Sequence, residues 1–365
     1  MKIMTVLGAR PQFIKASAVS GLIRKQHSEC LVHTGQHFDF NMSELFFREL
    51  NIPRPDYDLG ISGGTHAEQV GFMVRKLDKV MQEEKPDAVL VYGDTNSTLA
   101  GALVASQNKI PVIHVEAGLR SFDRSMPEEV NRILVDCVST LLFAPTAQAV
   151  KNLEQEGFSK KTHLVGDVMY DIFCRFEPVV RERKPVIIHQ WGLKEKGYSV
   201  LTIHRQGNVD KRKNLRNILE GLSQSGEMFV FPVHPRTKNI LSEIIFDNVL
   251  KEFGPRLRRI DPLGYIDFMA LVSGGKMVVT DSGGLQKEAY MLGVPCLTLR
   301  DSTEWVETIK TKWNRLVPVE TDQIRMSVKN VKKGKRFSRL YGDANAAEKI
   351  VNVITETFCH ENTYY

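Results

Sequence analysis

Short apolar runs alternate with longer amphipathic segments along most of this chain. In the first half, runs typical of buried β-strands occupy residues 1–7, 29–34, 87–92 and 110–115, and segments with helical period occupy 41–50, 65–84, 96–107 and 127–142. The second half repeats this plan with strand-like runs at 199–203, 228–233, 258–263, 277–280 and 294–299, and helical segments at 214–222, 284–292 and 344–357. Strands that alternate with helices of this length predict parallel sheets with helices on both faces.

The chain is long enough to predict two domains, because 365 residues exceed what one hydrophobic core usually supports. The pattern is weakest over residues 169–196, so we place the boundary near 167–174. We therefore expect an α/β fold with one doubly wound domain over 1–168 and a second over 169–343. The last helical segment, within 344–365, either closes the second domain or packs back onto the first.

The composition narrows the class of protein. Hydrophobic residues make up 42% and charged residues 25%, as in soluble globular proteins, and no run approaches the roughly 18 apolar residues that suggest a membrane span. The net charge of +6 comes with only short basic clusters, so we expect no nucleic-acid partner. The five cysteines are scattered without C-x-x-C spacing, which favours a reducing, cytoplasmic location.

Common cofactor and metal motifs are missing from the sequence. It contains neither the G-x-G-x-x-G fingerprint of a standard dinucleotide site nor a P-loop. It also contains no H-E-x-x-H and no carboxylate-rich metal loop. We therefore expect no cofactor and no required metal.

Unusual polar residues cluster where predicted strands end. In open α/β sheets ligands bind beyond the carboxyl ends of the strands, so a set drawn from both halves predicts one cleft between two domains. The residues are Arg10, Gln36, His37, Asp94, Glu116, His204, Arg205, His234, Asp281 and Ser282.

Two strand-to-helix turns are candidate anion sites. The amides of residues 8–11, with Arg10, are placed to hold an anion at a helix N-terminus. In the segment TDSGGLQKE, Gly283 and Gly284 let the backbone approach a ligand closely, and the free amides of the helix start suit a diphosphate. Glu288, on the same helix, is placed to accept hydrogen bonds from a ribose diol.

The segment HVEAGLRSFDRSMPEEVNR carries a third group of charges. Ser125-x-x-Glu128 matches a capping box with Pro127 in the first turn, and the apolar residues from Val130 to Leu142 are expected to face inward. Glu128 and Arg132 would then share the opposite side. An exposed salt-bridged helix start accounts for that pair, but not for Asp94 and Glu116 at the ends of buried-type strands.

Assembled, these residues resemble the non-hydrolysing UDP-N-acetylglucosamine 2-epimerase family from residue 1 to about residue 320. The resemblance rests on GARPQFIK, HTGQH, VYGDTNSTLAGALVA, HVEAGLRS, MPEEVNR, HPRT, TDSGGLQKEA and LGVPCLTLRDSTE. It implies a GT-B-type fold of two Rossmann-like domains, a UDP-sugar in the cleft between them, and a homodimer.

The resemblance also implies roles for individual residues. Asp94, Glu116 and Glu128 match the family's catalytic carboxylates and His204 its catalytic histidine. The substrate-binding set that it implies is Arg10, Lys15 and Arg132, with His234, Ser282, Gly283 and Glu288 holding UDP.

The implied chemistry gives these charges a purpose. The C2 proton of a UDP-N-acetylhexosamine is not next to a carbonyl, but departure of UDP from C1 makes it acidic. Loss of the proton gives a glycal, and protonation on the opposite face with return of UDP gives the 2-epimer. The reaction needs an acid/base group for each face and cations for the leaving diphosphate. Which carboxylate is the acid and which the base stays open.

Some positions depart from the common family pattern. Trp305 stands in DSTEWVE where the family usually has Arg, and GARPQF replaces GTRPEA; both resemble the branch that acts on UDP-2,3-diacetamido-2,3-dideoxy-glucuronic acid, a bacterial O-antigen precursor. Asp39 replaces the glutamine with which family members bind an activating second substrate.

Three alternative functions stay open besides the non-hydrolysing epimerase. They are a GT-B glycosyltransferase, a hydrolysing epimerase and a UDP-sugar-binding regulator without turnover.

Overall fold

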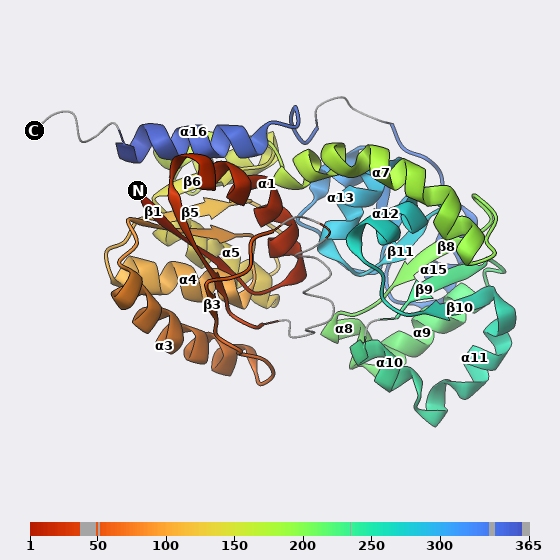
Figure 1. Ribbon diagram of the computed structural model, residues 1–365. Helices are drawn as coiled ribbons and strands as arrows, with labels where there is room; N and C mark the ends of the chain where they lie inside the picture. Colours follow the sequence, from red (N-terminus) through yellow and green to blue (C-terminus); the bar gives the residue numbers. More distant parts are fainter. Residues whose placement is uncertain (37–48, 50–51, 234, 336–339, 360–365) are drawn as a thin grey trace, which may run out of the picture. The chain divides into compact units, whose positions relative to one another are not determined.

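The chain forms two compact units. The computed structural model describes residues 1–36, 49, 52–233, 235–335 and 340–359. Unit 1 contains residues 1–175 and the segment from residue 339, and unit 2 contains residues 176–338. Each is a sheet flanked by helices (Figure 1). The sequence places the boundary near 167–174, and the compact units divide after Arg175.

Within the described residues, unit 1 is built on a seven-stranded sheet in the order β3-β2-β1-β4-β5-β6-β7, with every pair parallel. All residues of β4 are buried, as expected of an apolar strand covered on both faces. The strands are β1 (Lys2–Leu7), β2 (Ser28–His33), β3 (Tyr57–Asp58), β4 (Ala88–Tyr92), β5 (Val112–Val115), β6 (Leu141–Ala144) and β7 (Thr162–Leu164).

The helices of unit 1 form two groups of neighbours. α3 packs beside α4 and α4 beside α5, whereas α16, from the C-terminus, packs beside α1 (Figure 1). Thr65 and Glu68 form a capping box that starts α3. The helices are α1 (Arg10–Gln26), α3 (His66–Glu84), α4 (Asn96–Gln107), α5 (Pro127–Val138), α6 (Ala147–Gln155), η1 (Ser159–Lys161) and α16 (Ala346–Cys359).

Within its described residues, unit 2 has a six-stranded parallel sheet in the order β10-β9-β8-β11-β12-β13. The strands are β8 (Ser199–Thr202), β9 (Phe229–Pro232), β10 (Leu257–Ile260), β11 (Val278–Thr280), β12 (Cys296–Thr298) and β13 (Asn314–Leu316). The helices are α7 (Val168–Gln190, which begins in unit 1), α8 (Gln206–Val209), α9 (Arg212–Ser223), α10 (Pro235–Leu241), η2 (Ile244–Phe246), α11 (Asp247–Phe253), η3 (Gly254–Arg256), α12 (Tyr265–Gly274), α13 (Gly283–Leu292), α14 (Val306–Lys310) and α15 (Thr321–Lys329).

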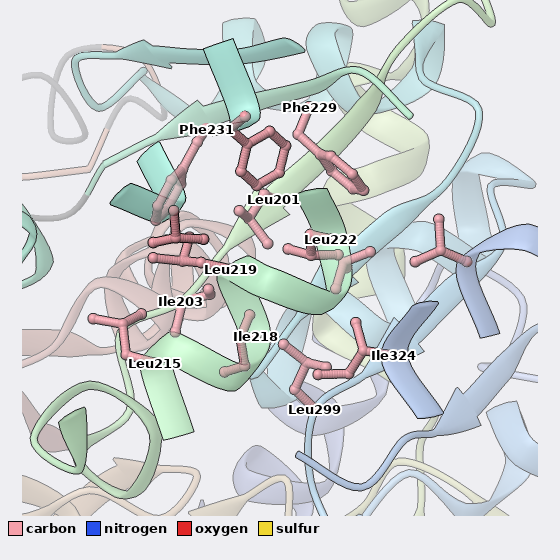
Figure 2. Close-up of a cluster of buried hydrophobic side chains, with 14 of the residues drawn as sticks. Leu201, Ile203, Leu215, Ile218, Leu219, Leu222, Phe229, Phe231, Leu299 and Ile324 are labelled. Carbon is pink, nitrogen blue, oxygen red and sulfur yellow. The ribbon is translucent and has the colours of Figure 1, made fainter. Parts of the chain in front are cut away.

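Helix α9 illustrates how the core of unit 2 forms. Its leucines and isoleucine recur at helical spacing and are fully buried in one cluster with aromatic residues of β9 (Figure 2). Each such side chain contributes about 1.5–3 kcal/mol by leaving water. The cluster shown includes Leu215, Ile218, Leu219, Leu222, Phe229 and Phe231.

Two sequence-based predictions about these elements are wrong. The helix predicted over 127–142 ends at Val138, because residues 141–144 form the buried strand β6. The N-cap of α5 is Met126, and the Ser125 hydroxyl donates to Asp123 instead of closing a capping box. Much of the weakly patterned stretch 169–196 forms helix α7, whose internal prolines obscure its sequence signal.

The predicted fold class is confirmed: both units are α/β with parallel sheets, the Rossmann-like plan. The helix predicted over 41–50 falls almost entirely outside the described residues. In the part of the chain that the structure describes, no helix is both long and apolar enough to cross a membrane.

Candidate active site

The carboxyl ends of β1 and β4 form a topological switch point in unit 1. From β1 the chain continues to β2 on one side of the sheet, whereas β4 lies on the other side of β1. Ligands of open parallel sheets bind beyond the strand ends at such a point. The turn after β4 carries Gly93 and Asp94, and Glu116 follows the neighbouring strand β5.

A buried ion pair lies over the turn after β4. The Lys15 ammonium, on α1, lies 2.5 Å from Glu116 Oε1, and the two residues are 6% and 8% exposed. A Cβ at Gly93 would lie 3.0 Å from Lys15 Nζ and 3.5 Å from Glu116 Oε1, so glycine leaves room for the pair. Glu116 has a φ of +72°, a conformation that costs a non-glycine residue about 1–3 kcal/mol and clusters at functional sites.

Arg132, on helix α5, binds Asp94, the residue that follows Gly93 in the turn after β4. Its Nη1 donates to Asp94 Oδ2 at 2.7 Å, and its Nε donates to Glu129 Oε2 at 3.0 Å. Glu129 also accepts from the backbone amides of Ser121 and Phe122, both at 2.9 Å. Burial alone would raise the pKa of Glu129, but the Ser121 amide and the charge of Arg132 outweigh it, so the pKa lies below its ordinary value. Glu129 therefore anchors the cation that holds Asp94.

The orientation of α5 is opposite to the prediction. Its polar residues Glu129, Arg132 and Asp136 are buried, whereas Val130 and Leu134 from its apolar stripe are 40% and 46% exposed. The helix turns its charged side toward the sheet because Asp94 and the loop after β5 supply partners for those charges. Arg132 pairs with Glu129, three positions earlier, within the helix.

The turn before α1 is less available to an anion than predicted. The side chain of Gln12 accepts from the amides of Gly8 and Ala9 at 2.8 and 3.0 Å and donates to the carbonyl of Tyr92. These two amides are therefore used within the protein. Arg10 is the first residue of α1 and is partly exposed, and its role in binding stays a prediction.

Unit 2 repeats the switch point at β8 and β11. β8 continues to β9 on one side of the sheet, and β11 lies on the other side of β8. His204 follows β8 and Asp281 follows β11. The backbone amides of His204 and Arg205 donate to the Asp281 carboxylate at 3.0–3.1 Å, so Asp281 ties the two strand ends together.

The glycine turn after β11 opens helix α13. Ser282 is its N-cap residue, and the first-turn amides of a helix have no acceptor within the helix. A Cβ at Gly283 would lie 2.3 Å from Glu304 Oε1, whereas a Cβ at Gly284 would meet no atom within 4 Å. Glu288 lies in the second turn of α13 and is 8% exposed. The turn is thus closed on the Gly283 side and open at Gly284, consistent with close approach of an anionic ligand.

The structure brings together most of the predicted residues of unit 1 but not all. Lys15, Asp94, Glu116 and Arg132 form one group around residues 93–94. Glu128 lies in the first turn of α5 and is partly exposed. His37, Asp39 and His234 lie outside the described residues.

Sequence reasoning missed Gln12 and Glu129, and it named Asp281 among the polar residues at strand ends without giving it a role. Glu129 and Asp281 stand inside the predicted motifs, one residue away from predicted site residues. Their role is to hold backbone amides, and only the three-dimensional structure shows which amides they reach.

No metal cluster emerges from the described residues: they contain no group of three or more His, Cys, Asp or Glu placed to hold a metal ion. The expectation that no metal is required stays a prediction.

Comparison with known proteins agrees with the motifs. The family model described as UDP-N-acetylglucosamine 2-epimerase matches residues 22–355. A UDP-N-acetylglucosamine 2-epimerase homolog of Methanococcus maripaludis is 46% identical over 97% of this chain and 99% of its own length. The UDP-2,3-diacetamido-2,3-dideoxy-D-glucuronate 2-epimerase of Pseudomonas aeruginosa is also 46% identical, over 98% of this chain and 100% of its own. The crystal structure of Methanocaldococcus jannaschii UDP-GlcNAc 2-epimerase in complex with UDP-GlcNAc and UDP is 41% identical with a TM-score of 0.91, covering 98% of this chain and 100% of that one.

Proposed function

Since the chain belongs to the UDP-N-acetylglucosamine 2-epimerase family, we propose that it is an isomerase that interconverts UDP-GlcNAc-type and UDP-ManNAc-type sugars without net hydrolysis. The observation that carries the proposal is the group of Lys15, Asp94, Glu116 and Arg132 at the switch point of unit 1. A transferase does not require two carboxylates at the ends of neighbouring buried strands, each paired with its own cation.

The reaction explains why carboxylates and cations occur together. Departure of UDP from C1 leaves an oxocarbenium-like centre that acidifies the C2 hydrogen. One carboxylate removes this proton to give a 2-acetamidoglucal, and a group on the other face of the ring returns one to C2 before UDP adds back. Lys15 and Arg132 compensate the charges of Glu116 and Asp94 and fix their positions, which preorganises the site.

Unit 2 supplies the nucleotide-binding part of the proposal. Ser282 and the amides of Gly283 and Gly284 receive the diphosphate, and Glu288 receives the ribose. His204 is the further acid/base group. His234, Arg10 and Glu128 complete the proposed set.

A deuterium-exchange experiment tests the proposal. The protein is incubated with UDP-GlcNAc in D2O, and NMR follows deuterium at C2 and free UDP. Deuterium at C2 with recovered UDP-sugar is the expected result. Release of UDP alone indicates hydrolysis, and no exchange with any tested sugar indicates a transferase or a sensor. Glu116→Gln should abolish exchange, whereas Glu154→Gln, at an exposed carboxylate of α6, should not.

The same experiment decides between two sugars. The Pseudomonas aeruginosa relative is named for a diacetamido uronate, and Trp305 stands where the common family pattern has Arg. Trp305 is 2% exposed, and Lys287 Nζ lies 4.0 Å from the centre of its ring. The tryptophan that replaces the family's arginine is therefore packed into the interior of unit 2. UDP-2,3-diacetamido-2,3-dideoxy-glucuronic acid is therefore the second substrate in the panel.

The proposal includes a homodimer formed through the outer face of α3, α4 and α5. This face exposes Phe72, Leu103, Val130 and Leu134, on helices that pack side by side. Contiguous exposed apolar side chains mark interaction surfaces. Leu134→Glu should convert a dimer to a monomer in light scattering, whereas Met326→Glu, at an equally exposed position on α15 (46% in both), should not. A wild-type monomer contradicts this part of the proposal.

The proposed location is the reducing cytosol. Cys30, Cys137, Cys174 and Cys296 are free thiols. Structural disulfides are rare in that compartment, so the thiols are consistent with it.

A further inference from the structure

We infer that Asp281 is a positioning residue for His204, an inference that rests on the proposed function because His204 is the acid/base group of that proposal. The inference starts from the switch point of unit 2, where the turns after β8 and β11 meet.

The geometry makes Asp281 the hub of the loop that carries His204. Its carboxylate is fully buried and accepts from the amides of His204 at 3.1 Å and Arg205 at 3.0 Å, and from Asn208 Nδ2 at 3.2 Å. The Oδ1 atom also lies 3.3 Å from Nδ1 of the His204 ring. The imidazole side chain is itself 40% exposed. One buried carboxylate therefore fixes the backbone of the histidine and faces one of its two ring nitrogens.

The charges near Asp281 also support its pairing with the His204 ring. Among the described residues, the side chain of His204 is the only potential cation within ion-pair distance of this carboxylate. A buried carboxylate needs hydrogen bonds and a counter-charge to offset lost hydration. Hence Asp281 favours the tautomer of His204 that carries its proton on Nδ1.

The consequence concerns the other ring nitrogen. With the proton on Nδ1, the lone pair lies on Nε2, which is then the nitrogen that receives a proton and later returns it in the proposed reaction. A carboxylate that orients a histidine in this way sets the tautomer without being protonated itself, as in the serine-protease triad. Asp281 thus acts through His204 rather than on the sugar.

The test replaces the carboxylate by an amide of the same shape. In Asp281→Asn, the three N–H donors hold the amide oxygen, so its NH2 group faces Nδ1 and donates to it. The ring should then change to the Nε2–H tautomer. Long-range 1H–15N NMR of histidine-labelled protein reads the tautomer directly, with the His204 signals identified by their loss in His204→Gln. We expect kcat for C2 exchange to fall about 10²- to 10⁴-fold with little change in KM.

A matched variant separates positioning from folding. Asp167 is 1% exposed and accepts the amide of Met169 at 2.8 Å, so Asp167→Asn also neutralises a buried carboxylate that holds backbone. It should leave the His204 tautomer and kcat unchanged. An Nε2–H tautomer in the wild type, an unchanged tautomer in Asp281→Asn, or an equal fall of kcat in both variants overturns the inference. If Asp281→Asn does not fold, the wild-type spectrum alone decides.

The two proposals fail separately. Absence of C2 exchange by the wild type with every sugar of the panel refutes the proposed function. The NMR spectrum requires no turnover, so it still tests whether Asp281 sets the state of His204.

Discussion

Replacing Lys15 by methionine removes the ammonium that lies 2.5 Å from Glu116 Oε1 and keeps most of the side-chain volume. Lys15 and Glu116 are 6% and 8% exposed, so water replaces little of what the carboxylate loses. Breaking a buried ion pair by removing one partner costs about 3–5 kcal/mol. We expect the lower end, about 3 kcal/mol, because Glu116 retains slight contact with solvent.

The predicted loss is large enough to measure. For a domain of the size of unit 1, each kcal/mol shifts Tm by about 2–4 °C, so the unfolding transition of unit 1 should fall by roughly 6–12 °C in calorimetry. The double variant Lys15→Met/Glu116→Gln removes both charges of this pair and should recover at least half of that shift, since neutral replacements of buried ion pairs are often well tolerated. Both variants should lose C2 exchange.

The matched control is Lys25→Met, an exposed lysine of the same helix, which should change neither Tm nor exchange. The reasoning is refuted if Lys15→Met has the Tm of the wild type. It is also refuted if the double variant is no more stable than the single one, because the loss then does not come from a buried charge.

Two further predictions concern stability elsewhere. Gly283→Ala should lower the free energy of unfolding in urea by about 1–3 kcal/mol, because the new Cβ would lie 2.3 Å from Glu304 Oε1. Gly284→Ala should keep the stability of the wild type but raise KM, because its new Cβ would meet no atom within 4 Å. Equal losses of stability in the two variants would contradict the geometry. Burial alone would raise the pKa of Asp136, but the hydrogen bonds and charges of His114 and Arg120 together outweigh burial, so the pKa is lowered. The stability that this carboxylate contributes is therefore present above about pH 4 and is lost as the pH falls through the folded-state pKa. The stability difference between wild type and Asp136→Asn should therefore shrink below pH 4 in urea titrations, and a pH-independent difference would count against it.

Helix α5 shows where sequence reasoning stops. The helical period and Pro127 were sufficient to predict the helix and its start near residue 127. They were insufficient to decide which side faces the sheet, because apolar residues normally do so. Here the apolar side is outside and Arg132 is inside, since one of its partners, Asp94, comes from the turn after β4, 38 positions earlier, and the other, Glu129, is held by amides of the loop after β5. Local rules fail most often at functional sites, and this helix is such a case.

The strand ends were more predictable than the helix faces. Parallel strands bring their carboxyl ends to one edge, so Asp94 and Glu116 were expected together from their positions alone. Neither the pairing of Lys15 with Glu116 nor the link from Asp281 to His204 follows from sequence spacing. The first pair is 101 positions apart in the chain and the second is 77 positions apart. Short strands such as β6 were missed since three or four apolar residues after a helix look like its continuation.

The return of α16 to unit 1 has a consequence for how the protein is made. Ile350, Val351 and Ile354 of this helix are buried, and His27 at the end of α1 bonds to Thr355 at 2.9 Å. Unit 1 therefore can be completed only when residues 346–359 have been translated, after the whole of unit 2. At about 5–20 residues per second, unit 2 takes roughly 10–30 seconds to be synthesised. During that time one side of α1 in unit 1 is not yet covered by α16. Unit 2, whose residues are continuous in the chain, can therefore fold before unit 1 is complete.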